Sequence, residues 1–382
     1  MDYELSSEQK DIKAAAREFA EGEFPEVGGA YDEREEYPME LWKKACTLGF
    51  IGLFMDERYG GAGLGFLEHL LVLEQFARVD PGCSHILLAA TGAELIEASG
   101  TEEQKERYLP GLARGDAIMG SVIPDNGAGT DEAVRRMTAC REGEAYVING
   151  EQAFVVNGSI ADHLVVSCVP AGPAEATNWR SSLFVVGTGS PGCEVFKLKG
   201  RLGLRACDAA RVRLSGVRVT EKELLGGGEG GGSDRVRPFL DGKRLEAAAL
   251  SIGIAEGAME QAVAYARQRR AFGRCVAAFE STQLKVAEMG AYIEASRRLC
   301  FEAAWLLDHG RRDSGLVSMA GWFAGMTGIR VVDEALQLHG GYGYITESRI
   351  ERFFRDATMA ENYGGCGESE KVSIGGAVIG PV

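Results

Sequence analysis

The chain lacks several features that would point to particular classes of function. Its 382 residues include 56 Asp and Glu but only 41 Lys and Arg, which gives a net charge of −15. Proteins that bind mainly nucleic acid need clustered cations to meet the phosphates. No apolar run approaches the roughly 20 residues of a membrane-spanning helix, and the N-terminus lacks the basic-then-apolar order of a signal peptide. We therefore expect a cytoplasmic protein whose partners include neither nucleic acid nor a membrane.

The nine cysteines are scattered and form no CxxC pair. This spacing predicts neither a zinc site nor a disulfide framework. Such cysteines are typical of small, buried apolar residues in a reducing compartment. We therefore expect no bound metal. The length exceeds that of a usual single core, so two or three packed units are expected.

Hydrophobic patterning divides the chain into three stretches. Residues 1–116 are predicted to be an N-terminal helical domain, because apolar residues recur at helical spacing. Residues 117–232 carry short β-rich runs, as in Leu164–Val169, which predict an antiparallel sheet domain. Their glycine-rich end, Gly226–Gly232, is typical of a flexible linker. Residues 233–382 return to helical periodicity and predict a C-terminal helical domain.

The order of helices, then sheet, then helices predicts the α+β class. It is not an alternating βαβ array, so a Rossmann dinucleotide fold is excluded. One ridge in the third stretch, Leu250 to Ala266 in steps of four, consists mainly of small residues suited to close helix packing.

The segment Gln337–Glu368 carries the most informative motif. A helix runs into Gly340 and Gly341, which can present backbone N–H groups to an anionic pyrophosphate without a Cβ in the way. Arg269 offers a permanent cation for the same phosphates. A second helix in the segment then carries Arg355-Asp356-Ala357.

This segment resembles the C-terminal signature of the acyl-CoA dehydrogenases, in which Q-x-x-G-G holds the FAD pyrophosphate. In that family R-D-A is followed by Y-E-G-T, and this Glu removes the α-proton of the acyl thioester. Here the matching residues are Tyr363, Gly364, Gly365 and Cys366. The family scaffold is therefore indicated, but its catalytic carboxylate is missing.

Four further segments match the family in order and spacing, so that the resemblance covers nearly the whole chain. They are Val122–Asp131, Asn149–Asn157, Leu240–Arg244 and Tyr265–Gly273, the last followed by Phe279-Glu280. The resemblance implies FAD as cofactor, an acyl-CoA substrate, an electron-transferring flavoprotein as acceptor and a homotetramer. In the family, the arginine that matches Arg269 reaches the FAD of a neighbouring subunit.

The resemblance also assigns individual residues. It gives FAD contacts to Val122, Pro124, Gly129, Thr130, Phe154, Val155, Val156, Arg269, Phe272, Phe279, Glu280, Gln337, Gly340, Gly341, Cys366 and Glu368. It gives substrate contacts to Thr130, Asp241, Arg244, Tyr363, Gly364 and Gly365. Three residues depart from the family beside the flavin: Pro124 and Val156 replace threonines, and Phe154 replaces a tryptophan but keeps an aromatic wall.

The base is absent from three known positions. Gly364 has no side chain, Lys243 stands where the isovaleryl type carries its Glu, and Thr91 lies in the stretch where some cyclic-substrate members use an Asp. Since an α-proton of a thioester is a very weak acid, its removal normally needs a positioned base.

Three interpretations remain open. In the first, another group acts as base, with Asp125, Glu361, Glu94 or neutral His85 as candidates, and the enzyme oxidises an unusual acyl-CoA, cyclic or dicarboxylic.

In the second, the substrate loses CO₂ or sulfinate and needs no base, so that Gly364 and Lys243 together turn a negative site positive. Acyl-CoA desulfinases of the family also have Gly at the base position. In the third, the chain binds FAD and acyl-CoA without turnover.

Overall fold

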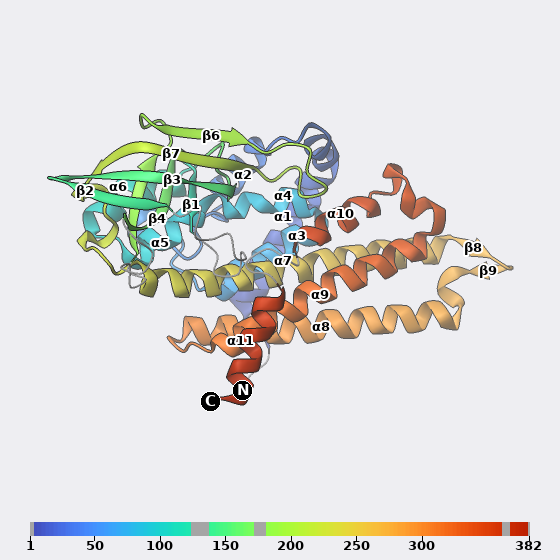
Figure 1. Cartoon of the computed structure of the whole chain (residues 1–382). Coiled ribbons are helices and arrows are strands. Elements are labelled where there is room, and N and C mark those ends of the chain that lie inside the picture. Colours follow the sequence, from blue (N-terminus) through green and yellow to red (C-terminus); the bar gives the residue numbers. More distant parts are fainter. Residues whose placement is uncertain (1–3, 124–136, 172–180, 361–366, 381–382) are drawn as a thin grey trace.

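The computed structural model describes residues 4–123, 137–171, 181–360 and 367–380. Helices come first along the chain, a β-sheet follows, and long helices complete the fold (Figure 1). The predicted α+β class, with a sheet between two helical parts, is confirmed.

The N-terminal helices begin at residues that the sequence marks as caps. Ser6 and Gln9 form a reciprocal capping box at the start of the first helix, and Thr101 and Gln104 form another at the start of the sixth. The helical elements are α1 (Ser7–Arg34), α2 (Met39–Thr47), η1 (Glu57–Tyr59), α3 (Phe66–Val79), α4 (Pro81–Ser84), η2 (His85–Ala90), α5 (Thr91–Ser99) and α6 (Glu102–Ala113).

The middle part is a seven-stranded sheet in the order β1-β4-β2-β3-β7-β6, with β5 paired to β4. Most pairings are antiparallel, as expected, but β4 runs parallel to both β1 and β2. The strands are β1 (Met119–Val122), β2 (Thr138–Glu142), β3 (Ala145–Val156), β4 (His163–Pro170), β5 (Ser182–Gly187), β6 (Cys193–Lys197) and β7 (Ala209–Thr220).

The glycine-rich segment predicted as a flexible linker is tied to the sheet domain. The N–H of Gly230 donates to Ser182 Oγ at 3.0 Å, and that of Gly232 donates to the Ser181 carbonyl at 2.7 Å. One short turn, η5 (Glu221–Glu223), precedes the segment, a second, η6 (Leu225–Gly227), includes its first two glycines, and the next helix begins at its last residue, Gly232. The segment connects the sheet to the next helix, as predicted for a linker, and these two hydrogen bonds hold Gly230 and Gly232 against the sheet domain.

Long helices form the C-terminal part, with a small hairpin at one end of the bundle (Figure 1). The elements are α7 (Gly232–Gln268), β8 (Arg270–Ala271), β9 (Arg274–Cys275), η7 (Val276–Ala278), α8 (Glu280–Asp308), α9 (Ser314–His339), η8 (Gly340–Tyr344), η9 (Thr346–Ser348), α10 (Ile350–Ala360) and α11 (Gly367–Ile379).

The predicted small-residue ridge of α7 is buried, and glycines let α3 come very close to it. A Cβ added at Gly253 would lie 2.4 Å from the Glu74 carbonyl oxygen, and one at Gly257 would lie 2.0 Å from that of Arg78. Each fully buried aliphatic side chain of the ridge, such as Leu250, contributes about 1.5–3 kcal/mol to folding.

By length and composition the helical segment Ser314–Tyr344 could cross a membrane, with a mean hydropathy of 1.3 over its best window. The expectation that no stretch would meet that criterion was therefore wrong. Half of that window is buried inside the protein, where α9 packs against α7, α8 and α11. The core helix of a bundle has the same properties.

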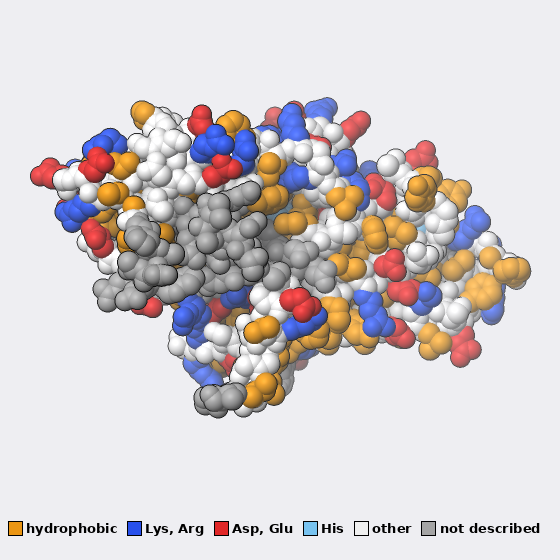
Figure 2. All heavy atoms as spheres, in the orientation of Figure 1, with side chains coloured by type: hydrophobic (Ala, Val, Ile, Leu, Met, Phe, Trp, Pro, Cys, Tyr) orange, Lys and Arg blue, Asp and Glu red, His pale blue; other side chains and the backbone are white. Residues whose placement is uncertain are grey.

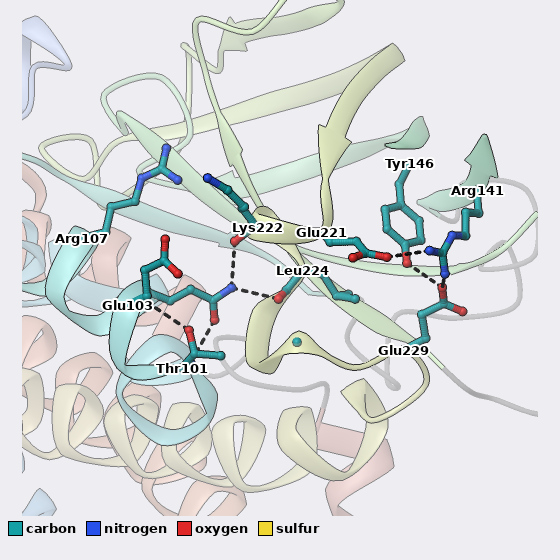
Figure 3. A pocket seen from close by; sticks show the side chains of 11 residues that line it. Thr101, Glu103, Arg107, Arg141, Tyr146, Glu221, Lys222, Leu224 and Glu229 are labelled. Carbon is teal, nitrogen blue, oxygen red and sulfur yellow. Dashed lines mark hydrogen bonds and ion pairs between the residues drawn. The ribbon is translucent and has the colours of Figure 1, made fainter. Parts of the chain in front are cut away.

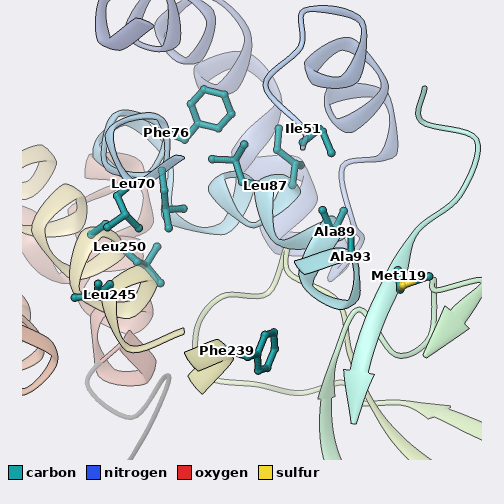
Figure 4. Packing of buried hydrophobic residues seen from close by; sticks show 14 of the residues in the cluster. Ile51, Leu70, Phe76, Leu87, Ala89, Ala93, Met119, Phe239, Leu245 and Leu250 are labelled. Carbon is teal, nitrogen blue, oxygen red and sulfur yellow. The ribbon is translucent and has the colours of Figure 1, made fainter. Parts of the chain in front are cut away.

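One hydrophobic core runs through both helical parts and into the sheet. Figure 4 shows buried residues of α7, such as Leu245, across from α3 and near the short helices that carry Leu87 and Ala93. Met119 of β1 lies on the other side of those helices (Figure 4). The short helix α5 is therefore placed between α7 and the edge of the sheet domain.

Candidate functional site

Four residues predicted to bind the pyrophosphate line one pocket of about 460 Å³. Arg269 comes from the C-terminal end of α7, Gln337 from the last turn of α9, and Gly340 and Gly341 from η8. Arg269 and Gln337, about 70 positions apart in the sequence, thus line the same pocket.

The glycines leave the pocket open to a ligand. A Cβ added at Gly340 or Gly341 would meet no heavy atom within 4 Å, and Gly340 has φ +57°. Among the described residues, the exposed Arg269 guanidinium takes part in no ion pair. The N–H of Gly340 donates to the Gln337 carbonyl, so it is the open space above the two glycines, beside the Arg269 guanidinium, that leaves room for a pyrophosphate.

The hairpin beside this pocket presents aromatic surface. Phe272, at its tip, is 98% exposed, and its ring lies 6.5 Å from that of Phe279. The guanidinium of Arg274 lies 3.9 Å above the Phe279 ring. Glu280 is exposed at the start of α8. These residues therefore lie at the end of the bundle that carries the pocket.

A second cluster of polar groups is buried where α3, α5 and α7 meet. Lys243 Nζ donates to Glu94 Oε1 at 2.6 Å and to the two carboxylate oxygens of Glu246 at 2.8 and 2.7 Å. His69 Nε2 lies 3.1 Å from Glu246 Oε1. The cluster therefore holds two carboxyl groups, one ammonium and one imidazole.

Burial and charge act differently on the two carboxyl groups. Burial raises the pKa of Glu94 to about 8, and the charge of Lys243 opposes this only in part. Burial alone would also raise the pKa of Glu246, but Lys243 and the hydrogen bond from His69 hold it well below its ordinary value. Burial would lower the pKa of Lys243, but the two carboxyl groups raise it. Glu246 therefore carries the stable negative charge, and Glu94 is the group that gains or loses a proton.

These contacts change the interpretation of Lys243 as a cation for the substrate. The sequence suggested that its ammonium could attract an anionic acyl group, but Glu246 already neutralises it and Glu94 also bonds to it. A neutralised cation gives little net attraction to a second anion.

The residues predicted to flank the flavin lie near the ends of β1 and β3, two strands that are not paired in the sheet but are in contact. Val122 is buried at the end of β1, while Phe154 is largely exposed near the end of β3. The two strands are in contact, since a Cβ at Gly120 would lie 3.2 Å from the Val156 carbonyl. Val155, between Phe154 and Val156, is buried. The structure thus brings these predicted residues together.

The predicted CoA contacts are linked to other side chains. The buried Asp241 carboxylate accepts from Arg312 Nε at 2.5 Å and from Arg244 Nη1 at 3.0 Å. Arg244 Nε also donates to Glu370 Oε1 of α11 at 2.7 Å. Glu368, which was predicted to contact FAD, is exposed at the start of α11 and pairs with Lys371 at 2.7 Å. Asp241 and Arg244 thus join α7 to the C-terminal helix.

Several predicted residues lie outside the described part of the chain. They are Pro124, Asp125, Gly129, Thr130, Glu361, Tyr363, Gly364, Gly365 and Cys366. Their predicted roles rest on the sequence alone.

Two other positions considered for the base can be placed. The hydroxyl of buried Thr91, at the start of α5, donates at 2.6 Å to the carbonyl of Leu88 in the preceding η2. Burial lowers the pKa of His85 to about 4, so this imidazole is neutral, and its Nδ1 lies 2.9 Å from the Pro81 carbonyl. The alternative of a neutral His85 therefore agrees with the structure in charge, but the ring is fully buried.

The sequence analysis missed His69 and Glu246. One signal for Glu246 was available, since it follows Lys243 by three positions on the same helix within an otherwise apolar run. His69 lies within the apolar stretch of α3 and carries no motif.

A third feature is a polar pocket of about 530 Å³ between α6 and the sheet (Figure 3). Arg141 pairs there with Glu221 at 2.6 Å and with Glu229 at 3.3 Å. Tyr146 donates to Glu229 at 2.6 Å, as the labelled side chains show. No predicted site residue lines this pocket, and its principal charges neutralise one another.

Comparisons with known proteins cover the whole chain. The family models for the N-terminal, middle and C-terminal domains of acyl-CoA dehydrogenases match residues 6–116, 122–217 and 230–379. A short-chain-specific acyl-CoA dehydrogenase of Clostridium acetobutylicum is 35% identical over 381 residues, covering 99% of this chain and 100% of that protein.

A subunit of the caffeyl-CoA reductase–Etf complex of Acetobacterium woodii, CarC, is 31% identical and covers 98% of this chain and 99% of its own length. The solved structure of butyryl-CoA dehydrogenase from Megasphaera elsdenii superimposes with a TM-score of 0.93, at 31% identity and full coverage of both chains.

Proposed function

The chain belongs to the acyl-CoA dehydrogenase family, and from this premise we propose that it uses FAD to oxidise or reduce the Cα–Cβ bond of an unusual acyl-CoA thioester. The observation that carries the proposal is the pocket that joins Arg269, Gln337, Gly340 and Gly341. Bound FAD supplies the two-electron acceptor or donor that a C–C bond requires. The protein supplies the phosphate cradle, the wall at Phe154 and the binding surface for the thioester.

The proposal includes a second copy of the chain. Lys243 and Arg269 lie 26 positions apart along continuous helix α7, which corresponds to roughly 39 Å at 1.5 Å per residue. The ribityl chain between the pyrophosphate and the flavin ring of one FAD is far shorter than that. A flavin beside the Lys243 end of α7 therefore needs the pyrophosphate pocket of another subunit.

Surface chemistry supports such an assembly. Figure 2 shows hydrophobic side chains toward the end of the bundle that carries β8 and β9. Phe272, at the tip of that hairpin, and Tyr344, in η8, are almost fully exposed. Exposed aromatic residues in such numbers are typical of contact surfaces. We propose a homotetramer, as the family resemblance implies.

An electron-transferring flavoprotein is the proposed redox partner. The Acetobacterium relative is named as a subunit of a reductase–Etf complex. That relative is a reductase and the Clostridium relative a dehydrogenase, so the direction of reaction follows the substrate and the electron supply. The acidic composition and the reduced state expected of the cysteines support a cytoplasmic location.

The substrate is proposed to be unusual because the site near Lys243 is unusual. Two acids and a histidine surround it, and a cyclic or dicarboxylic acyl group is the proposed class. The decarboxylase or desulfinase alternative loses the support that a free Lys243 would give it, since the ammonium is neutralised within the protein.

The test is anaerobic mixing of the purified FAD-containing protein with butyryl-CoA, glutaryl-CoA and 3-phenylpropanoyl-CoA, followed by flavin absorbance. At least one thioester should bleach the flavin. Release of CO₂ without bleaching would instead establish the lyase, and no change with any thioester would establish an inactive binding subunit.

A further inference from the structure

We propose that Glu94 is the catalytic residue that removes the Cα proton during oxidation and returns it during reduction, while Lys243, Glu246 and His69 position it. This assignment rests on the proposed function. It gives the missing base a residue on α5, whereas the motif analysis sought it chiefly in the loop that contains Gly364.

The position of Glu94 supports the assignment first. Its helix contacts the sheet edge directly, because a Cβ at Gly92 would lie 2.4 Å from Met119 Cγ and 2.6 Å from the Gly120 carbonyl oxygen. Gly120 in turn contacts Val156, beside the predicted flavin wall. On the other side, Glu94 bonds to Lys243, which lies between the predicted CoA contacts Asp241 and Arg244 in sequence. Glu94 thus belongs to the helix that packs between β1, whose end carries the predicted flavin contact Val122, and the turn of α7 that carries the predicted CoA contacts.

The second argument for Glu94 is the accessibility of its side chain. The side chain of Glu94 is 16% exposed, compared with 9% for Lys243, 2% for His69 and 0% for Glu246. Glu94 is therefore the most accessible member of the cluster. Only one of its oxygens bonds to Lys243, whereas both oxygens of Glu246 do.

The third argument for Glu94 is the arrangement of charge in the cluster. Glu246 neutralises Lys243, so Glu94 can change its protonation state without leaving Lys243 unpaired. Burial raises the pKa of Glu94, and a base whose pKa lies near the working pH is the most effective proton acceptor. Among the charged groups on the elements around α5, Lys243 and Glu246 act on Glu94, while Lys105 of α6 acts on Glu97 and His85 of η2 is neutral.

The proposed step balances. The Glu94 carboxylate takes the Cα proton and becomes a carboxylic acid. Bound FAD would supply the two-electron acceptor for the Cβ hydrogen, so that the Cα–Cβ single bond would become a double bond. In reduction, the carboxylic acid returns the proton to Cα. Lys243, through its hydrogen bond, fixes the reacting carboxylate, and Glu246 with His69 fixes Lys243.

The experiment compares the FAD-containing wild type with Glu94→Gln and Glu94→Asp. Glu97→Gln, one turn further along α5, is the matched control. Two rates are measured with the three thioesters named above: flavin reduction, and exchange of the Cα hydrogen with D₂O, followed by mass spectrometry. Glu94→Gln should lower both rates by roughly 10²–10⁴-fold, Glu94→Asp should restore part of the loss, and Glu97→Gln should change neither by more than about twofold.

The pH profile gives a readout that a purely structural role would not move. The carboxylate is the active form in oxidation, so the wild-type rate should rise with pH as Glu94 deprotonates, and this rise should be absent from the residual rate of Glu94→Gln. If Glu94→Gln fails to fold, the wild-type profile and Glu94→Asp decide: a rate independent of pH, with Glu94→Asp fully active, overturns the assignment.

The outcomes separate the two proposals. Flavin reduction and Cα exchange that persist within threefold in Glu94→Gln overturn the role of Glu94 and leave the proposed function intact. A wild-type protein that is reduced by none of the thioesters overturns the proposed function, and the role of Glu94 with it.

Discussion

One helix carries two sites of opposite character at its two ends. At the C-terminal end of α7, Arg269 is exposed and meets open glycine backbone. Near the other end, Lys243 is buried and fully engaged by carboxyl groups. An exposed cation that forms no ion pair within the described part of the chain is available for a ligand, whereas a buried, neutralised cation is part of the protein's own structure. A basic side chain is therefore available to bind a ligand at one end of α7, and at the other end it is part of a buried ion-pair cluster.

Removing the cation of the buried cluster gives the largest expected effect. Lys243→Met leaves Glu94 and Glu246 facing each other without a counter-charge, and it should lower the free energy of unfolding by about 3–5 kcal/mol. The two carboxyl groups would then take up protons in the folded state at higher pH than in the unfolded state. Their contribution to the free energy of unfolding is therefore fully present in acid and is lost as the pH rises. The loss of stability of Lys243→Met relative to the wild type should then be larger at about pH 9 than at about pH 5.

Urea unfolding at both pH values measures this, with Lys44→Met as the control. Lys44 pairs with Glu23 at 2.5 Å, but its side chain is 55% exposed, so its loss should change stability by less than about 1 kcal/mol. Equal losses in the two variants would show that the buried cluster contributes no more than a surface ion pair.

The two ends of α7 also differ in what the sequence could predict. Gln337, Gly340 and Gly341 lie within one short motif and Arg269 lies in another, so the resemblance of these motifs to the family was enough to assign all four to the same phosphates. The buried cluster joins residues as far as 177 positions apart in the sequence. Glu94 and Lys243 were each considered, but as alternatives: one as a base, the other as a cation for the substrate. Their contact depends on how α5 packs against α7, which no local pattern specifies.

The fold likewise has features that local sequence patterns predict and features that depend on distant contacts. Hydrophobic periodicity predicted the helical parts and the sheet, because burial of one face imposes a period. It did not predict that β4 runs parallel to β1 and β2, or that Gly230 and Gly232 are tied to the sheet domain. Both depend on partners distant in sequence, as does the link from Asp241 to Arg312.

Removing the cation at the other end should affect FAD binding and leave folding unchanged. Arg269→Ala deletes a charged hydrogen-bond donor worth about 1.5–3 kcal/mol, so FAD affinity should fall by roughly 10–100-fold. Because Arg269 is exposed, the stability of the FAD-free protein should change by less than about 0.5 kcal/mol. Flavin fluorescence titration and thermal unfolding measure the two quantities.

Arg267→Ala is the matched control for this prediction, since Arg267 is also exposed near the end of α7 but does not line the pocket. It should leave FAD affinity unchanged. If both variants retained FAD equally, the assignment of Arg269 to the pyrophosphate would be wrong.

The smallest expected effect comes from replacing one of the two pocket glycines with alanine. At Gly341 the methyl group would take space from the ligand, whereas at Gly340 it would strain the backbone. Gly341 has room for a Cβ and lies outside the positive-φ set, so Gly341→Ala should leave the FAD-free protein as stable as the wild type. Its methyl group would crowd the pyrophosphate and should weaken FAD binding by roughly threefold to tenfold, which is at most about 1.4 kcal/mol.

Gly340, with φ +57° and ψ −135°, adopts a conformation that alanine rarely does, so Gly340→Ala should cost about 1–3 kcal/mol of stability even without FAD. Calorimetric titration of the two variants with FAD tests this, because a Gly341→Ala protein that bound FAD normally would mean that the open backbone at η8 is not the phosphate cradle.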